Sequence, residues 1–458
     1  MPKLASYYLP GLYVEDHSVE APLDWRGTEP ERAAADGLPA GERIHVFYRT
    51  VCAPQNVGRD LPLLVFLQGG PGGQGPRLLS PTSDGWIAEA VKHFRVVLPD
   101  QRGTGRSEHA SAKSVARRGD THAQADYLKR LLARSIVRDF EYIRLTEFGG
   151  RAWTTLGQSY GGFLTLTYLS FYPQGVAASF TCGGIPHVPT SAADVYAHTF
   201  PRMAAKTRAY YARYPQDEAR MAAIADRLAA GDVTLPDGSP LTPRRLQTLG
   251  GGLGMKPAPE RLHNLLDTAF EAGDGSLAST GAAPELTDGF LMGALEDLTT
   301  AGNPLYWTLQ EFIYANGTLD APINWTAEHE YARHPEFDAT ARPLMLTGEA
   351  AFPFMFEDDP LLAPLKPAVD LLMQDTEFDP IYDEHQLAAN EVPLQAAVYF
   401  DDLYVDSGLQ LDTLSRVGAS HAWVTNEFEH DGLHGSVVFA HLFEEALNRG
   451  DLERALRS

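Results

Sequence analysis

The sequence predicts an α/β protein built on a mostly parallel sheet. Short runs of strand-forming residues alternate with stretches of helical periodicity, and the connections between them are short and rich in glycine. Two of the runs, 61–67 and 94–98, are almost continuously apolar. Such runs are typical of strands that are buried on both faces of a parallel sheet.

Composition and charge narrow the class of protein further. The 458 residues are 44% hydrophobic and 21% charged, as in an ordinary globular protein, and at about 150 residues per domain they allow two or three domains. Lys and Arg number 37 against 60 Asp and Glu, which gives a net charge of −23. Because nucleic acids and anionic membranes are bound by basic surfaces, we expect neither as a partner.

The amino-terminal segment predicts an antiparallel edge of the sheet. Residues 13–19 and 42–49 are short runs of β-formers, separated by a connection rich in Pro, Gly and charged residues. The buried strand at 61–67 then ends in a glycine-rich loop at 68–73, and the strand at 94–98 ends in a similar loop at 99–105.

The strand and helix alternation continues through the middle of the chain. Apolar residues recur at helical spacing over 123–148, and Gly149-Gly150 end this helix. A strand at 152–156, a helix at 163–171 and a strand at 177–182 follow.

Between residues 186 and 370 the pattern changes. The segment is rich in Ala, Arg, Glu and Leu, contains few strand-like runs, and has clear helices at 193–214 and 217–230. We predict a mostly helical domain at 186–370, inserted into a core formed by 1–185 and 371–458.

The α/β pattern returns after the insertion. Asp379-Pro380 begins a predicted helix that runs to residue 389, because proline is tolerated at a helix start. The last elements are predicted at the positions that follow: a strand at 394–400, a helix at 409–417, a strand at 421–425 and a helix at 437–448.

The motif Gly157-Gln158-Ser159-Tyr160-Gly161 lies between a predicted strand and an apolar helix. In that position G-x-S-x-G forces a sharp turn that exposes the serine hydroxyl, and the helix start favours negative charge there. Ser159 is therefore the candidate nucleophile. The main-chain N–H of Tyr160 is one candidate for the oxyanion hole. The second is Gly69, with Gly70 as the alternative, in the loop after an earlier strand.

Three motifs together resemble a known family. QGGPGG at 68–73, DQRGTGRS at 100–107 and GQSYGG at 157–162 resemble the proline iminopeptidase group of α/β-hydrolases, which are serine peptidases. Stretches at 346–349, 399–405 and 423–433 are similar to its larger-enzyme branch. The resemblance implies an α/β-hydrolase fold with a helical cap after the strand that follows the nucleophile helix, and an aminopeptidase that prefers proline. Many members have His where this chain has Gln68, whose amide can also hold the loop.

The same order of elements places the acid and the base. Asp401 and Asp402 both follow the strand at 394–400, and the resemblance favours Asp402. Among the histidines after that strand, His430 follows the strand at 421–425 by a short loop and matches the family's histidine, with His434 as the alternative.

An aminopeptidase must also bind a free ammonium group, for which carboxylates are natural partners. The resemblance implies Glu311 first and Glu349 second, with Glu427 as a third candidate; in so acidic a chain each of them is also compatible with a solvated surface position. Four aromatic residues are compatible either with a pocket for a proline ring or with ordinary core positions: Tyr160, Phe312, Tyr314 and Phe352. We expect Asp100 and Arg102 to support the loops, and Asp358-Asp359 to form a surface turn, with a role in lining the cap as the alternative.

The remaining features favour a metal-free enzyme. The 15 histidines form no H-E-x-x-H motif, and the two cysteines, Cys52 and Cys182, make no disulfide framework, so we expect no metal and no cofactor. We expect no signal peptide and no transmembrane run, and a cytoplasmic enzyme acting on short peptide or aminoacyl substrates. An esterase or amidase using the same triad is the alternative, and a non-catalytic binding protein is disfavoured by the complete Ser, Asp and His set. The sequence leaves the oligomeric state open.

Overall fold

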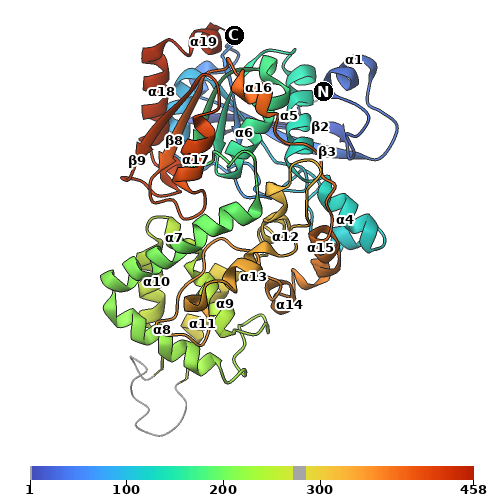
Figure 1. Ribbon diagram of the computed structural model, residues 1–458. Coiled ribbons are helices and arrows are strands. Elements are labelled where there is room, and N and C mark those ends of the chain that lie inside the picture. Colours follow the sequence, from blue (N-terminus) through green and yellow to red (C-terminus); the bar gives the residue numbers. More distant parts are fainter. Residues whose placement is uncertain (1–2, 272–284, 458) are drawn as a thin grey trace.

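The computed structural model describes residues 3–271 and 285–457, and within them one nine-stranded sheet forms the centre of the fold (Figure 1). The strands are β1 (Ala5–Leu9), β2 (Leu12–Pro22), β3 (Arg43–Cys52), β4 (Leu63–Leu67), β5 (Arg95–Pro99), β6 (Trp153–Gln158), β7 (Val176–Cys182), β8 (Leu394–Tyr399) and β9 (Ser420–Thr425). Their order is β1-β2-β3-β5-β4-β6-β7-β8-β9.

Strand direction follows the division that the sequence predicts. β1, β2, β3 and β5 pair antiparallel, whereas β5, β4, β6, β7, β8 and β9 pair parallel. The predicted mostly parallel α/β sheet with an antiparallel amino-terminal edge is therefore confirmed. β1, which precedes the first predicted strand, adds a hairpin at that edge.

The register brings the ends of the central strands to one level. Gly157 of β6 lies beside Leu67 of β4 and Thr181 of β7, and Cys182 lies beside Ala397 of β8. The loops after β4, β6, β7 and β8 consequently begin at the same edge of the sheet, which is where parallel α/β sheets bind ligands.

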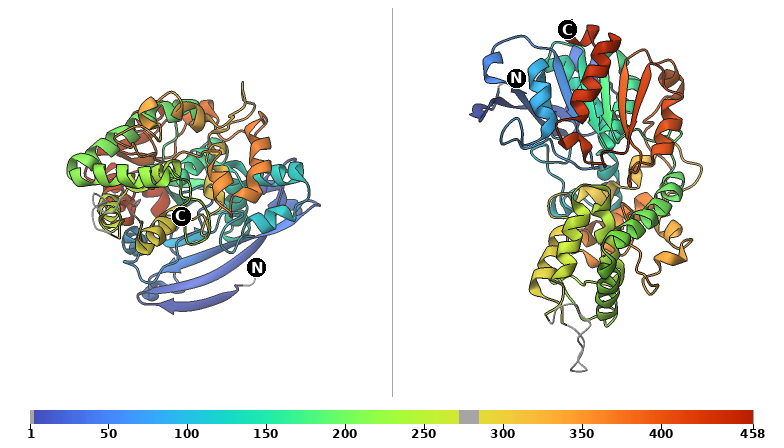
Figure 2. Two further views of the ribbon diagram at one scale, coloured as in Figure 1. Left: turned by 90° about the horizontal axis from the view of Figure 1, so that it is seen from below. Right: turned by 90° about the vertical axis from the view of Figure 1, so that its left-hand side faces the viewer.

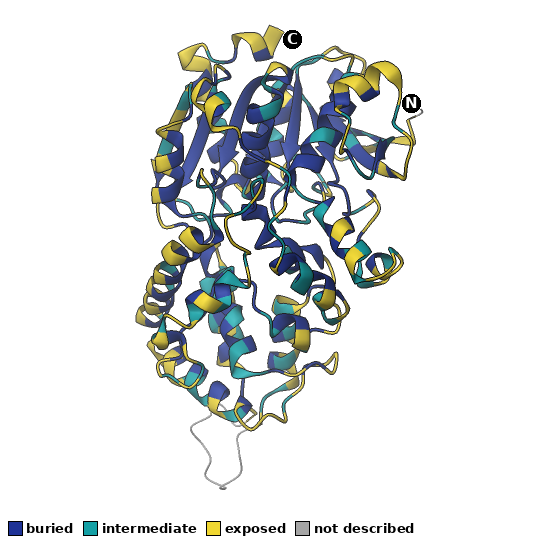
Figure 3. Ribbon diagram, turned by 45° about the vertical axis from the view of Figure 1, so that its right-hand side comes forward, coloured by how far each residue is buried: buried dark blue, intermediate teal, exposed yellow. Residues whose placement is uncertain are grey.

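Helices cover both faces of the sheet. One face packs against α2 (Gly85–His93), α18 (Val438–Arg449) and α19 (Glu453–Arg457). The other packs against α1 (Pro30–Asp36), α5 (Ala133–Glu147), α6 (Tyr160–Phe171), α16 (Glu384–Ala388) and α17 (Ser407–Leu414). β4 shows the period of two: Leu64 and Phe66 face the first layer, whereas Leu63, Val65 and Leu67 face the second. Figure 3 shows these strands buried and the outer helix surfaces exposed.

A second body of helices lies beyond one end of the sheet (Figure 2, right). It contains α7 (Ala192–Arg213), α8 (Pro215–Leu228), α9 (Pro243–Gln247), α10 (Ala258–Asp267), α11 (Asp288–Leu298), α12 (Leu305–Leu309), α13 (Thr326–Tyr331), α14 (Met355–Asp358) and α15 (Lys366–Met373). Two further helices, α3 (Ala112–Ala116) and α4 (Thr121–Lys129), precede α5, and α15 packs on α4. The domain limits of 186 and 370 stay a prediction.

Two predicted helices differ from the structure. The stretch 123–148 is not one helix, because the chain breaks between α4 and α5, where the main-chain oxygen of Arg130 accepts a bond from the buried Arg102 guanidinium. The helix predicted from Asp379-Pro380 forms only as α16. The N–H groups of Ile381 and Tyr382 bond to Asn316, and Asp383 caps the helix instead.

Candidate active site

Ser159 occupies the sharp turn between β6 and α6. Its φ of 54° and ψ of −125° lie in a region that non-glycine residues rarely adopt. The main chain holds this conformation, because the N–H of Ser159 donates to the oxygen of Cys182 at 3.1 Å and its oxygen accepts from Gly162 at 2.8 Å. Ser159 is the N-cap residue of α6, yet its hydroxyl makes no capping bond to the described helix. The hydroxyl is thus available for chemistry.

The loop after β4 lies directly against this turn. A β-carbon added to Gly69 would come within 3.0 Å of the Ser159 β-carbon and 2.6 Å of Gln158 Oε1, so the site requires glycine there. The main-chain oxygen of Gln68 accepts a bond from Gln101 at 2.7 Å, which anchors this loop to the one after β5. Gly69 and Tyr160, the two predicted oxyanion donors, thus flank Ser159.

Asp402 and His430 form a buried pair. Nδ1 of His430 lies 2.8 Å from Oδ2 of Asp402, whose other oxygen accepts the N–H groups of Tyr404 and Val405 at 2.8 and 3.0 Å. Asp402 is 0% exposed and His430 is 6% exposed. The two backbone bonds to one oxygen of Asp402 therefore hold its other oxygen toward the imidazole ring of His430.

The surroundings of His430 favour its protonated form. Burial lowers its pKa, but the charge of Asp402 and the hydrogen bond to it, followed by the charges of Glu349 and Asp431, outweigh burial and leave the pKa raised. An imidazolium formed by proton transfer would be stabilised by the same groups.

The alternative acid and base lie elsewhere. Asp401 is exposed, whereas its neighbour Asp402 is fully buried. His434 pairs with Asp84, the residue before α2, at 3.0 Å, and this contact raises the pKa of His434. Neither Asp401 nor His434 joins the Asp402–His430 pair.

Glu349 lies close to this pair. Burial raises its pKa, while a hydrogen bond from the Tyr306 hydroxyl and the nearby charge of His430 lower it. Glu349 also lines a cavity of about 420 Å³ together with Tyr404 and Asp431, and the Tyr404 ring lies 4.6 Å from that of His430. A ligand in this cavity would therefore meet a carboxylate whose charge acts on His430.

Glu311 is bound differently. Its two carboxylate oxygens accept the N–H groups of Thr326 and Ala327, each at 2.9 Å, at the start of α13. Burial raises its pKa to about 8, although the bonds from Ala327 and Thr326 oppose the rise. Glu311 thus caps a helix, and Glu427, the third candidate, is exposed.

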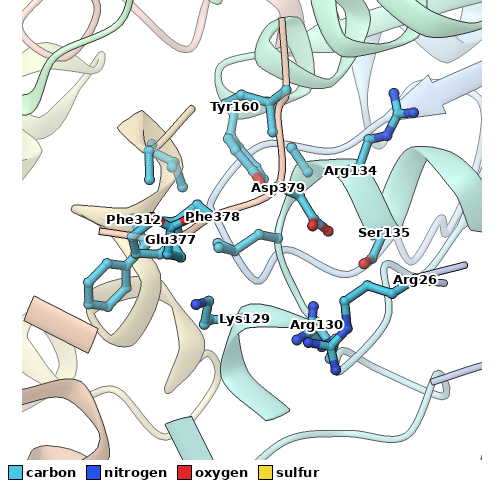
Figure 4. A pocket seen from close by; sticks show the side chains of 15 residues that line it. Arg26, Lys129, Arg130, Arg134, Ser135, Tyr160, Phe312, Glu377, Phe378 and Asp379 are labelled. Atoms are coloured by element: carbon cyan, nitrogen blue, oxygen red, sulfur yellow. The ribbon is translucent and has the colours of Figure 1, made fainter. Parts of the chain in front are cut away.

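A second cavity, of about 230 Å³, is lined by Tyr160 together with residues of α4 and α5 and of the segment 377–381 (Figure 4). Figure 4 shows the Tyr160 side chain pointing into it, opposite Lys129, Arg130 and Arg26. These cations are paired with carboxylates: Arg26 with Asp24 at 2.8 Å, Lys129 with Asp375 at 2.8 Å and Arg130 with Asp126 at 2.5 Å. Their charges are therefore already compensated.

The predicted supporting residues fix the loops around the site. Asp100 accepts bonds from Gly75 at 3.0 Å and Arg77 at 2.6 and 2.8 Å, and the buried Arg102 pairs with Asp139 at 2.6 Å. At Asp358-Asp359 the expected surface turn is wrong for Asp359, and the alternative of a cap-lining role agrees with its position. That carboxylate is buried, accepts a bond from Thr300 at 2.9 Å and lines the larger cavity.

A family model described as alpha/beta hydrolase fold matches residues 62–218. A proline iminopeptidase from Aeromonas sobria is 39% identical over 430 residues, which cover 93% of this chain and 94% of that protein. The chain belongs to the proline iminopeptidase family. The family resemblance and the α/β-hydrolase fold predicted from the motifs are confirmed.

Two other proteins that this chain resembles are also described as proline iminopeptidases. Proline iminopeptidase aneH from Aspergillus aculeatus is 33% identical over 399 residues, which are 85% of this chain and 86% of that protein. A solved structure of a proline iminopeptidase from Mycobacterium smegmatis aligns with 99% of both chains at 13% identity and a TM-score of 0.38. In the described ranges, 3–271 and 285–457, no helix combines the length and apolarity needed to cross a membrane.

Several residues at this proline iminopeptidase site escape the sequence patterns. Tyr306 holds Glu349, and Gly183 and Gly184 let the turn after β7 approach Asp402 and Ser159. Tyr306 belongs to the helical segment, where no motif marks individual positions. Tyr404 could have been predicted to lie near the site, because it follows the Asp401-Asp402 pair in the sequence.

Proposed function

We propose that this protein is a serine aminopeptidase that releases amino-terminal residues, preferably proline, from short peptides. The observation that carries the proposal is the combination of Ser159 in a strained strand-to-helix turn with the buried Asp402–His430 pair, at the common edge of a parallel sheet. The named relatives add the reaction class, since two proline iminopeptidases match most of the chain.

The proposed reaction begins with proton transfer. Nε2 of His430, the nitrogen that does not face Asp402, takes the hydroxyl proton of Ser159, and the oxygen attacks the scissile carbonyl carbon. The oxyanion is bound by the N–H groups of Gly69 and Tyr160. His430 then protonates the leaving amine, an acyl-enzyme remains on Ser159, and water activated by His430 hydrolyses it.

Substrate selection is proposed to depend on the ammonium group. Glu349 is the better placed acid, because it lines the larger cavity, its charge acts on His430, and its carboxylate accepts a bond from a side chain, Tyr306. Glu311 is the second candidate, since both of its oxygens already bind the backbone of α13. The helical body, as a cap over this edge, would restrict entry to small substrates and exclude water.

The decisive experiment compares substrates on the purified protein. We expect hydrolysis of prolyl arylamides, weaker hydrolysis of alanyl arylamides, and a requirement for a free amino group. Ser159→Ala should lower kcat by about 10⁵-fold or more without unfolding the protein. Cleavage of simple aryl esters alone would favour the alternative, a small-molecule esterase or amidase on the same triad.

A pair of neighbouring variants tests the acid. Asp402→Asn should lower kcat by about 10⁴-fold, because the amide no longer holds the imidazole in the productive tautomer. Asp401→Asn is the matched control, since Asp401 is exposed, and it should keep wild-type kcat. Similar losses in both variants would reject the assignment of Asp402.

A further inference from the structure

The loop that carries His430 is anchored to the core at two points. This loop, 426–437, connects β9 to α18. His430 bonds to Asp402, and His434 bonds to Asp84 beside α2. A β-carbon on Gly85 would come within 2.3 Å of the Gly435 carbonyl carbon, so the two backbones touch there. The core thus holds the end of the loop and the ring of the histidine.

The helical body holds the middle of the same loop. Lys206 of α7 donates to both oxygens of Glu429 at 2.7 Å. The N–H of His430 itself donates to the oxygen of Gly254 at 3.0 Å. The N–H of Lys256 donates to Asp431 at 3.1 Å, and its ammonium group donates to the oxygen of Glu427 at 2.8 Å. Glu429, His430 and Asp431 are therefore each bonded to the helical body.

The helix α7 also holds the loop that carries Asp402. Arg202 donates to the oxygen of Phe400 at 3.1 Å and to the hydroxyl of Ser407 at 2.9 Å, and it pairs with Asp406. Arg202 and Lys206 are four residues apart and so lie on one face of α7. In Figure 1 this helix passes below α17 and β9. One helix face thus reaches both of the loops that carry the proposed acid and base.

The two ion pairs that α7 makes with these loops are partly buried. The side chains of Lys206 and Glu429 are 17% and 21% exposed, and those of Arg202 and Asp406 are 26% and 6% exposed. Burial raises the pKa of Glu429, and the bonds from Lys206 oppose this rise. A backbone bond from Leu409 and, after it, the contact with Arg202 hold the pKa of Asp406 below its usual value against burial. Partly buried pairs of this kind are screened less by salt than exposed pairs.

We propose that Arg202 and Lys206 are positioning residues that set the Asp402–His430 pair from the helical body. The proposal rests on the proposed serine hydrolase chemistry. In this arrangement the helical body contributes to proton transfer as well as to substrate entry, because the loops of acid and base are both fastened to α7. Loosening either contact changes the orientation of the imidazole ring without removing any group that binds substrate.

The test uses substitutions of Lys206 on α7 and of its partner Glu429 in the loop of His430. Lys206→Met should lower kcat for a prolyl arylamide by about 10- to 100-fold, the range expected when a reacting group is misplaced by about 1 Å, and should leave KM within about twofold. Lys206→Arg should restore most of kcat, because it can still bind Glu429. Glu429→Gln, an isosteric change, should reproduce the loss, and the double variant should be no worse than either single one, as expected of partners in one contact.

Arg213→Met provides the matched control. Arg213 is also on α7 and pairs with Glu260 of α10 at 2.6 Å, within the helical body, so its loss should leave kcat unchanged. The proposal is overturned if Lys206→Met keeps wild-type kcat, if KM alone changes, or if Arg213→Met is impaired to the same degree.

Labelling of Ser159 by a fluorophosphonate separates this proposal from the proposed substrate. Labelling needs the base but not the ammonium site, so its rate should also fall by about 10-fold or more in Lys206→Met and Glu429→Gln. A wild-type protein that is labelled quickly but cleaves no prolyl arylamide would refute the aminopeptidase proposal and leave this one standing. Equal labelling rates in wild type and both variants would refute the positioning role.

Discussion

The glycines that follow Ser159 in the sequence are required by close packing around the turn. A β-carbon on Gly161 would come within 1.8 Å of the Leu67 oxygen, and one on Gly162 within 2.2 Å of the Gly184 oxygen. Larger residues would push α6 away from β4 and from the turn after β7. A non-glycine residue at φ 54° costs about 1–3 kcal/mol, which the surrounding backbone bonds sustain.

Glu349 allows a prediction in which two effects have different origins. In Glu349→Gln, KM for a prolyl arylamide should rise by about 10- to 100-fold, because a charge-assisted hydrogen bond to the ammonium group is lost. The negative charge of Glu349 also contributes to the raised pKa of His430. Its removal lowers that pKa, so the base is neutral at lower pH and the acid limb of the kcat/KM profile moves to lower pH.

Steady-state kinetics across pH, with a free-amine and an N-blocked substrate, measures both effects. The N-blocked substrate should show the shift of the acid limb with little change in KM. Glu444→Gln, at an exposed position of α18, serves as the control and should change neither quantity. Equal changes in KM for the two substrates would remove Glu349 from the ammonium site.

Among the elements, α13 depends on one buried carboxylate. Above the raised pKa of about 8, where Glu311 is ionised, Glu311→Gln should lower the free energy of unfolding by about 1–3 kcal/mol, because the amide NH₂ would face one of the two N–H groups that Glu311 binds. Urea unfolding measures the loss, and Glu391→Gln, at an exposed position, should show none. If Glu311→Gln is as stable as wild type but raises KM, Glu311 acts on the substrate rather than on the helix.

The accuracy of the element predictions depends on what decides each boundary. The apolar runs of β4 and β5 are correctly predicted, because burial on both faces leaves a continuous pattern. The break between α4 and α5 is missed, since Leu131 and Leu132 continue the helical period while Arg102, from a distant part of the chain, binds the Arg130 oxygen. Such a contact leaves no local signal.

For the molecule as a whole, the net charge of −23 leads to a test of electrostatic steering. The larger cavity is lined by Asp297, Glu349, Asp359 and Asp431 and by three cations, Arg245, Lys256 and Arg261, so most of the excess negative charge lies outside its lining. If the field attracts ammonium groups, kcat/KM for cationic peptides should fall at least about twofold between about 0.01 and 0.15 M salt, as the Debye length shrinks from about 30 to about 8 Å. A neutral ester should show no such fall, and equal salt dependence of both substrates would assign the charge to solubility.

The sequence by itself determined the α/β class, the family and the candidates Ser159, Asp402 and His430, because strand burial and turn motifs are local and leave periodic or fixed-spacing patterns. Only the tertiary structure decided which acid meets the histidine, that Glu311 caps a helix, and that Arg202 and Lys206 reach the loops of Asp402 and His430. The physical reason is that these contacts join segments far apart in the chain, and a long-range hydrogen bond depends on the packing of whole helices rather than on neighbouring residues.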